Sequence, residues 1–158
     1  MTTTSMKNLF ISIAILLIVS CSNISESGNE QKLPVTGSWQ LIKAQTIEGK
    51  DTTTSYFTEN KKAIKIITDT HFAFFQHDLN KGIDSTKIYV SGGGKCTIEG
   101  IKYTEYLEYC NYREWEGHTF SFELEVNGDT LIQKGIEKVE ELEVDRVIIE
   151  TYVRLCIV

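Results

Sequence analysis

The chain has 158 residues, of which 41% are apolar, and its length predicts one domain with room for a tail. Its 16 basic and 22 acidic side chains give a net charge of -6, which argues against a nucleic-acid-binding protein, since such a protein needs a basic surface to meet phosphates. Four cysteines are too few for a small disulfide scaffold, and one proline is too few for a disordered linker protein.

The N-terminal segment has the pattern of an export signal. Lys7 supplies a positive charge, and all residues from 9 to 19 except Ser12 are apolar. As a helix this stretch rises about 16 Å, roughly half the hydrocarbon thickness of a bilayer, so it is too short to span one. The next residues, Ile18-Val19-Ser20-Cys21, resemble a bacterial lipobox. The resemblance implies cleavage before Cys21 and acylation of its sulfur; the alternative is an ordinary cleaved signal in which Cys21 is incidental.

We therefore expect three parts: a lipoprotein signal at 1–21, a flexible tether at 22–36 and a folded domain at 37–158. The tether is rich in Ser, Asn, Glu and Gln and has no periodicity. Ser22 follows the cysteine where, in enteric bacteria, an aspartate would signal retention in the inner membrane. The expected location is the cell envelope, with the acyl chains on Cys21 held in the outer membrane.

The folded part consists of short runs rich in Ile, Val, Thr, Tyr and Phe, separated by turn residues, which predicts a meander of strands. We place the strands at 37–46, 62–68, 71–77, 86–90, 93–98, 101–112, 118–126, 129–137 and 146–157. Asn127-Gly128 predicts a type I′ hairpin turn, Glu99-Gly100 a weaker turn and Asp69-Thr70 a tight turn. Such short connections force antiparallel neighbours, and closure removes exposed edges. We expect an all-β fold, a small up-and-down barrel of about 8–9 strands.

Two gaps between the predicted strands stand out by their length, 47–61 and 78–85. Loops of this length on a barrel rim often act as lids over the mouth. Surface insertions without a function are the alternative interpretation, and the sequence favours neither.

The two ends of the predicted barrel carry a family pattern. Gly37-Ser38-Trp39 opens the first strand, and Arg154 lies near the end of the last. This arrangement resembles the calycin superfamily, the lipocalins and fatty-acid-binding proteins, whose chains begin with Gly-x-Trp and end with an Arg. The resemblance implies that Arg154 packs over the indole of Trp39 at the closed end of the barrel. Further stretches resemble a group of lipocalin-like bacterial lipoproteins of unknown function: 67–72, 103–109 and 150–154.

Alternation predicts which polar side chains point inward, because every second residue of a barrel strand faces the interior. The more apolar face of the strand at 101–112 carries Ile101, Tyr103, Glu105, Leu107 and Tyr109. A buried carboxylate without a partner is costly, so Glu105 needs a hydrogen-bond partner. The candidates are Tyr89, His71 and Arg154. In the functional interpretation Glu105, Tyr103, His71 and Tyr89 contact a ligand headgroup; in the alternative, an internal network only sets strand register.

Histidine and cysteine spacing limits the other chemistries. His71 and His77 would lie about 20 Å apart along a strand, too far to share one ion, so we expect no metal site and no cofactor. With Cys21 acylated, three cysteines remain in an oxidising compartment: Cys96, Cys110 and Cys156. A Cys96–Cys110 bridge would need a bulge, because the predicted register puts the two on opposite faces. A Cys110–Cys156 bridge would need distant strands to meet.

Together these features predict a lipid-anchored, monomeric, non-catalytic envelope protein whose barrel binds a small apolar molecule or a lipid. One alternative is a filled barrel with a structural or partner-binding role. Another is a small hydrolase or isomerase, which would require Glu105 and His71 in direct contact within a cavity. A cavity above about 300 Å³, open at one end, would favour ligand binding over the filled barrel.

Overall fold

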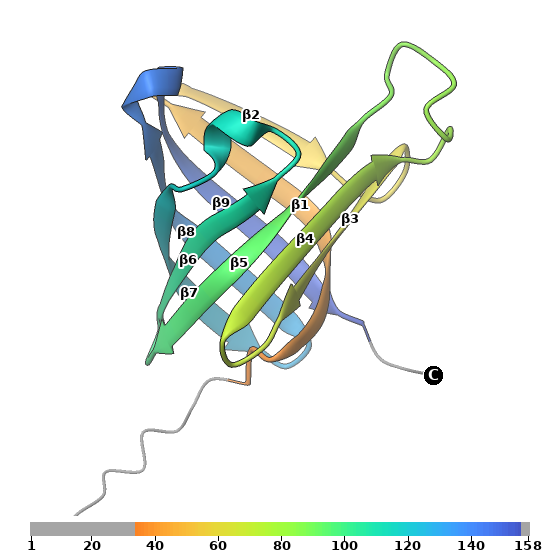
Figure 1. The fold of residues 1–158 in the computed structure, drawn as a ribbon. Coiled ribbons are helices and arrows are strands. Elements are labelled where there is room, and N and C mark those ends of the chain that lie inside the picture. Colours follow the sequence, from red (N-terminus) through yellow and green to blue (C-terminus); the bar gives the residue numbers. More distant parts are fainter. Residues whose placement is uncertain (1–33, 156–158) are drawn as a thin grey trace, which may run out of the picture.

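The computed structural model describes residues 34–155, which form a closed antiparallel barrel (Figure 1). The expected signal at 1–21 with Cys21, most of the expected tether, and Cys156 lie outside the described residues. Within the described range, no helix has both the length and the apolar character that crossing a bilayer requires.

Nine antiparallel strands form one sheet in which neighbours follow the order of the chain, except that the second strand lies outside the first, and this confirms the predicted all-β barrel. Their bounds are β1 (Gly37–Glu48), β2 (Asp51–Tyr56), β3 (Lys61–Ile67), β4 (His71–Asp78), β5 (Tyr89–Glu99), β6 (Lys102–Cys110), β7 (Thr119–Asn127), β8 (Thr130–Val139) and β9 (Val144–Arg154). Two short 3-10 helices, η1 (Arg113–Trp115) and η2 (Glu140–Leu142), join β6 to β7 and β8 to β9. Pairing of β1 with β9 closes the barrel, so eight strands form its wall and β2 is an extra strand on β1.

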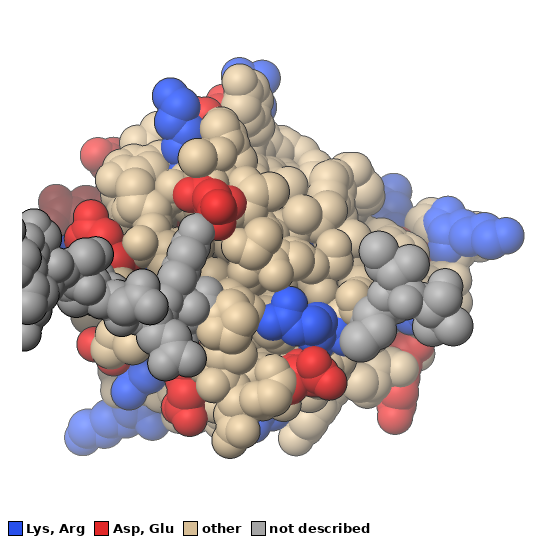
Figure 2. All heavy atoms as spheres, turned by 90° about the horizontal axis from the view of Figure 1, so that it is seen from below, with Lys and Arg blue, Asp and Glu red and all other residues tan. Residues whose placement is uncertain are grey.

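The two ends of the barrel differ in their connections. At one end, which we call the closed end, the links are short: 68–70, 100–101 and 128–129. At the other, the loop end, lie η1, η2, the β1–β2 hairpin and the loop 79–88, which projects furthest from the wall (Figure 1). Figure 2 looks onto the closed end, whose centre is covered by atoms and shows no opening.

Some predicted strand boundaries are wrong, because local sequence patterns do not specify which strands pair. The gap 47–61 is not a loop, since it contains β2, which pairs with the second half of β1. The strands predicted at 86–90 and 93–98 are one strand, β5. Both hairpin turns are shifted by one residue, to 100–101 and 128–129. Gly128 has a φ of 57° but Asp129 has no positive φ, so this turn is not type I′.

A β-bulge between β5 and β6 resets the alternation along β6. Gly94 lies opposite Leu107 and Gly93 opposite Tyr109, which leaves Glu108 as an extra residue. Glycine is required here, because a Cβ on Gly94 would lie 2.0 Å from the carbonyl oxygen of Tyr106. At this bulge β5 and β6 therefore lie closer together than a side chain at position 94 would allow.

The expected inward face of β6 is correct only before the bulge. Tyr103, Glu105 and Leu107 are buried as predicted. Tyr109 lies beyond the bulge and is 70% exposed, and Ile101 lies in the turn and is 57% exposed, so both predictions are wrong. Alternation fails wherever an extra residue or a turn interrupts the pleat.

The same bulge corrects the expectation for the cysteines. The extra residue Glu108 changes the face of the residues that follow it, so Cys110 points into the barrel, as Cys96 does. They are therefore not on opposite faces. Both are free thiols, and burial raises the pKa of each.

The packed core occupies the closed-end half of the barrel. Trp39, Ile67, Tyr103 and Leu131 come from the closed-end segments of β1, β3, β6 and β8, and each is at most 1% exposed. These large side chains meet at the barrel axis and exclude water from this half. The other half, towards the loop end, is hollow.

Candidate ligand-binding cavity

The hollow half of the barrel encloses a cavity of about 370 Å³. Its mouth is at the loop end. There the cavity is lined by Trp115, the last residue of η1, and by Tyr112, the residue just before η1. Much of its wall is apolar, contributed by inward-facing side chains: Leu41, Phe74, Leu107, Phe120, Phe122 and Ile148. Every second residue of these strands faces the barrel interior, so the cavity wall follows directly from barrel closure.

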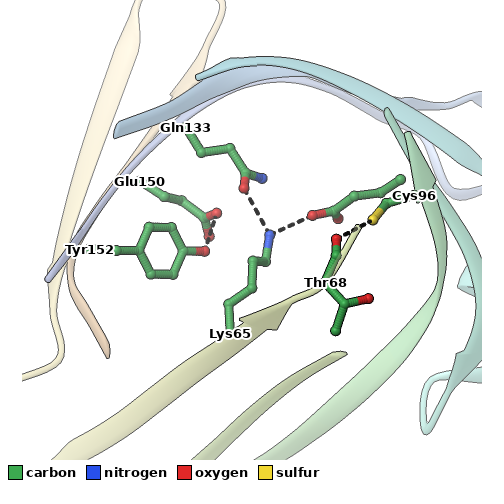
Figure 3. Close-up of polar contacts among 7 residues, drawn as sticks. Lys65, Thr68, Cys96, Gln133, Glu150 and Tyr152 are labelled. Carbon is green, nitrogen blue, oxygen red and sulfur yellow. Dashed lines mark hydrogen bonds and ion pairs between the residues drawn. The ribbon is translucent and has the colours of Figure 1, made fainter. Parts of the chain in front are cut away.

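A buried ion pair lies at the inner end of the cavity. The ammonium of Lys65 donates to Oε1 of Glu105 at 2.6 Å and to Oε1 of Gln133 at 2.9 Å (Figure 3). All three side chains are buried, although they come from β3, β6 and β8. Each acceptor offsets part of the cost of burying the ammonium.

Aromatic rings surround the same ammonium. The ring centres of Phe72, Tyr103, Phe122 and Tyr152 lie 5.7–5.9 Å from Nζ of Lys65. Burial alone lowers the pKa of Lys65, but the nearby carboxylates, that of Glu105 above all, raise it further than burial lowers it. Lys65 therefore carries its charge inside the barrel.

A second ion pair lies nearer the mouth. Glu137 of β8 and Arg146 of β9 are cross-strand partners, and Nη2 of Arg146 lies 2.6 Å from Oε2 of Glu137. The Nε of Arg146 donates to the same oxygen at 2.7 Å. The guanidinium also lies over the ring of Trp115, 5.6 Å from its centre, which ties η1 to the barrel wall.

Between these two pairs lies a carboxylate with a hydroxyl partner. Tyr152 donates its hydroxyl to Oε2 of Glu150 at 2.6 Å (Figure 3). Burial and the neighbouring carboxylate of Glu150 raise the pKa of Tyr152 well above its usual value, so the phenol stays a donor. The β8–β9 side of the cavity is thus polar, whereas the side formed by β4, β6 and β7 is mostly apolar.

One buried hydroxyl has no partner among the described residues. The hydroxyl of Tyr103 is fully buried and makes no hydrogen bond with a described side chain or backbone group. Tyr103 lies beneath the cavity rather than in its lining. It therefore supports the inner end of the cavity through its ring, 5.9 Å from Nζ of Lys65.

Trp39 and Arg154 lie together at the closed end. The guanidinium carbon of Arg154 is 4.1 Å from the centre of the Trp39 ring, and the two residues are cross-strand partners in β1 and β9. Arg154 also donates to the carbonyl oxygens of Thr36 at 3.1 Å and of Pro34 at 2.5 Å. The indole N–H of Trp39 donates to the carbonyl oxygen of Val35 at 2.7 Å. These contacts seal the closed end.

Two predicted ligand contacts are not in the cavity, so the structure does not bring them to Glu105. His71 points outward, and its Nδ1 is 2.9 Å from the hydroxyl of Thr70. Tyr89 is 60% exposed on the outer face of β5. Both were expected partners of Glu105, as was Arg154, which instead bonds backbone at the closed end. The partner that Glu105 has is Lys65.

The cavity residues that sequence reasoning missed share a simple signal. Lys65 has the same strand parity as the buried Ala63 and Ile67, and Glu150 and Arg146 have the same parity as Tyr152. Polar residues at inward positions of β3 and β9 therefore had to meet inside the barrel. This signal identifies Lys65 only once the inward face of β3 is known, because Ile64 and Ile66 make the outward face of β3 look equally apolar.

Among residues 34–155, no three His, Cys, Asp or Glu side chains lie close enough to hold one metal ion. The chain matches no protein-family model, and a search of curated proteins finds no relative. The fold and the cavity geometry are therefore what a functional assignment can rest on.

Proposed function

We propose that the protein is a lipid-anchored envelope protein that binds a small, largely apolar molecule inside a lipocalin-like barrel. The observation that carries this proposal is the cavity of about 370 Å³ at the loop end. This volume is within the range of about 300–1,000 Å³ typical of small-molecule sites. A filled barrel, the alternative, would close this space with its own side chains.

The wall chemistry supports a binding role. Aromatic and aliphatic side chains on one side offer apolar contact area, and a few fixed polar groups on the other side would orient the ligand. Binding rather than catalysis is proposed because Glu105, the carboxylate expected to act as an acid or base, is held by the ammonium of Lys65 at 2.6 Å. A catalytic role would also need the contact with His71, which lies on the outer face.

Ligand binding is tested by solvent extraction and mass spectrometry. The full chain is purified from its own cells in detergent-free polymer-bounded membrane discs, and the bound small molecules are compared between variants. Ala63→Met places a longer side chain in the cavity, whereas Ala73→Met adds the same atoms on the outer face of β4. A molecule that accompanies the wild-type chain and Ala73→Met, and is lost from Ala63→Met, supports the proposal. Identical small-molecule content in all three chains contradicts it.

The lipid anchor is a separate part of the proposal and rests on the residues around Cys21. It is tested by feeding cells an alkyne-tagged fatty acid and detecting the label on the full chain. Label on the wild-type chain and none on Cys21→Ala supports acylation at this residue. Equal labelling of both chains, or of neither, contradicts it.

A further inference from the structure

The formal charges of the side chains that line the cavity do not sum to zero. The cations are Lys65 and Arg146, and the carboxylates are Glu105, Glu137 and Glu150. With all five ionised, the lining carries one negative charge more than positive, and burial raises the pKa of both Glu105 and Glu137 in spite of their cationic partners. A surplus charge inside an apolar wall is costly unless an opposite charge meets it.

The two cations are already held by carboxylates. Lys65 lies 2.6 Å from Glu105, and Arg146 contacts one oxygen of Glu137 through both Nε and Nη2. The surplus therefore falls on Glu150. No Lys, Arg or His of the described chain forms an ion pair with Glu150, whose one described hydrogen bond comes from the hydroxyl of Tyr152.

Glu150 is placed where a ligand can reach it. Its carboxylate points into the barrel beside the hydroxyl of Tyr152 (Figure 3), and its side chain is only partly buried. Tyr152 donates to Oε2, and no described side chain donates to Oε1. The cavity that Glu150 lines is also lined by the aromatic rings of Phe74, Phe120 and Phe122.

We infer that the cavity takes an organic cation, a molecule with a small apolar body and a protonated primary or secondary amine that pairs with Oε1 of Glu150. This inference rests on the proposed function and specifies the class of ligand. The apolar body contacts the aromatic wall, and the ammonium gives the lining its missing positive charge. An anionic ligand is disfavoured, because it would add negative charge to a lining whose cations are already paired.

The test uses three probes with one apolar body and different head groups: 4-phenylbutylamine, 4-phenylbutan-1-ol and 4-phenylbutyrate. Their affinities for the full chain are measured by isothermal titration calorimetry at pH 7. We expect the amine to bind at least about tenfold tighter than the alcohol, and the butyrate to bind weakest. This order isolates the effect of charge, because the phenylbutyl group is common to all three.

Glu150→Gln removes the charge and keeps an oxygen that can accept the hydroxyl of Tyr152, so the wall stays intact. Glu123→Gln is the matched control, since Glu123 is exposed on the outer face of β7. The amine should lose about tenfold in affinity in Glu150→Gln and none in Glu123→Gln, while the alcohol binds both alike. Thermal unfolding of each variant verifies that the fold is retained. A further variant, Tyr152→Phe, leaves Glu150 charged and should keep the preference for the amine over the alcohol.

Two kinds of failure are distinguishable. If amine and alcohol bind equally, if the butyrate binds tightest, or if Glu150→Gln and Glu123→Gln behave alike, the inference is overturned and the apolar cavity of the proposed function stands. If no probe binds, the inference is also overturned. The extraction experiment with Ala63→Met then decides whether the proposed function fails with it.

Discussion

Lys65 and Glu105 form a buried ion pair of 2.6 Å between β3 and β6, two strands that are not neighbours in the sheet. Their side chains are 6% and 8% exposed, and 40 residues separate them in the chain. The contact exists only because the barrel closes and brings the inward faces of both strands to one axis. Barrel closure thereby places this ion pair, and its charges, at the inner end of the cavity.

Removing one member of this pair should be far more harmful than removing both. Lys65→Met leaves the carboxylate of Glu105 buried without a cation, and we expect a loss of about 3–5 kcal/mol in unfolding free energy, measured by urea unfolding. The double variant Lys65→Met/Glu105→Leu should recover much of this loss. Lys62→Met, at an exposed position of the same strand, is the control. Equal stability of Lys65→Met and Lys62→Met would show that the ion pair is not required.

Arginine and lysine should not be interchangeable at position 154. Arg154→Lys keeps the charge but loses the planar group over Trp39 and at least one of the two bonds to the carbonyl oxygens of Thr36 and Pro34. We expect a loss of about 1–2 kcal/mol in unfolding free energy, followed by tryptophan fluorescence. Arg113→Lys, whose side chain is 81% exposed on η1, should have little effect. A loss of similar size in both variants would argue against the packing role.

The bulge between β5 and β6 should not tolerate a side chain. Gly94→Ala places a Cβ where the carbonyl oxygen of Tyr106 would be 2.0 Å away, so the strands must separate. We expect a loss of at least about 1–3 kcal/mol, seen as a lower Tm by circular dichroism. Ser91→Ala in the same strand is the control. An unchanged Tm for Gly94→Ala would mean that the strands pair with a different register.

The loop 79–88 should open in acid through Asp78. Its Oδ1 accepts from the amide of Gly82 at 2.9 Å and its Oδ2 from the amide of Ile88 at 3.1 Å. These backbone bonds, that from Gly82 first, lower the pKa of Asp78 below its usual value. A lowered pKa means that the folded loop favours the carboxylate. The stabilisation is complete above the pKa of the unfolded chain and is lost as the pH falls through the lowered folded value.

Amide NMR can follow this transition. The Gly82 and Ile88 amide signals should shift together, with a midpoint on the acid side of an ordinary aspartate. Asp78→Asn should abolish the shared transition and loosen the loop already at neutral pH, since an amide cannot accept both bonds. Asp145→Asn, at an exposed position of β9, should leave the transition in place. Separate midpoints for the two amides would contradict a common origin in Asp78.

The sequence alone determined the class of fold, because strands and tight turns depend on neighbours along the chain. Alternation along β6 correctly predicted that Tyr103, Glu105 and Leu107 are buried. The carboxylate of Glu105 also signalled that a buried partner must exist. The contact between Trp39 and Arg154 followed from a family resemblance rather than from any local rule.

Only the tertiary structure decided which partner Glu105 has and where the barrel is hollow. Lys65 contacts Glu105 across the barrel axis, and no local sequence pattern predicts a contact between residues this far apart in the chain. The bulge at Gly94 moved Tyr109 outward, although its position in the sequence predicts the opposite. Register and cavity volume arise from the closure of eight strands on one another, so they depend on contacts between residues far apart in the chain.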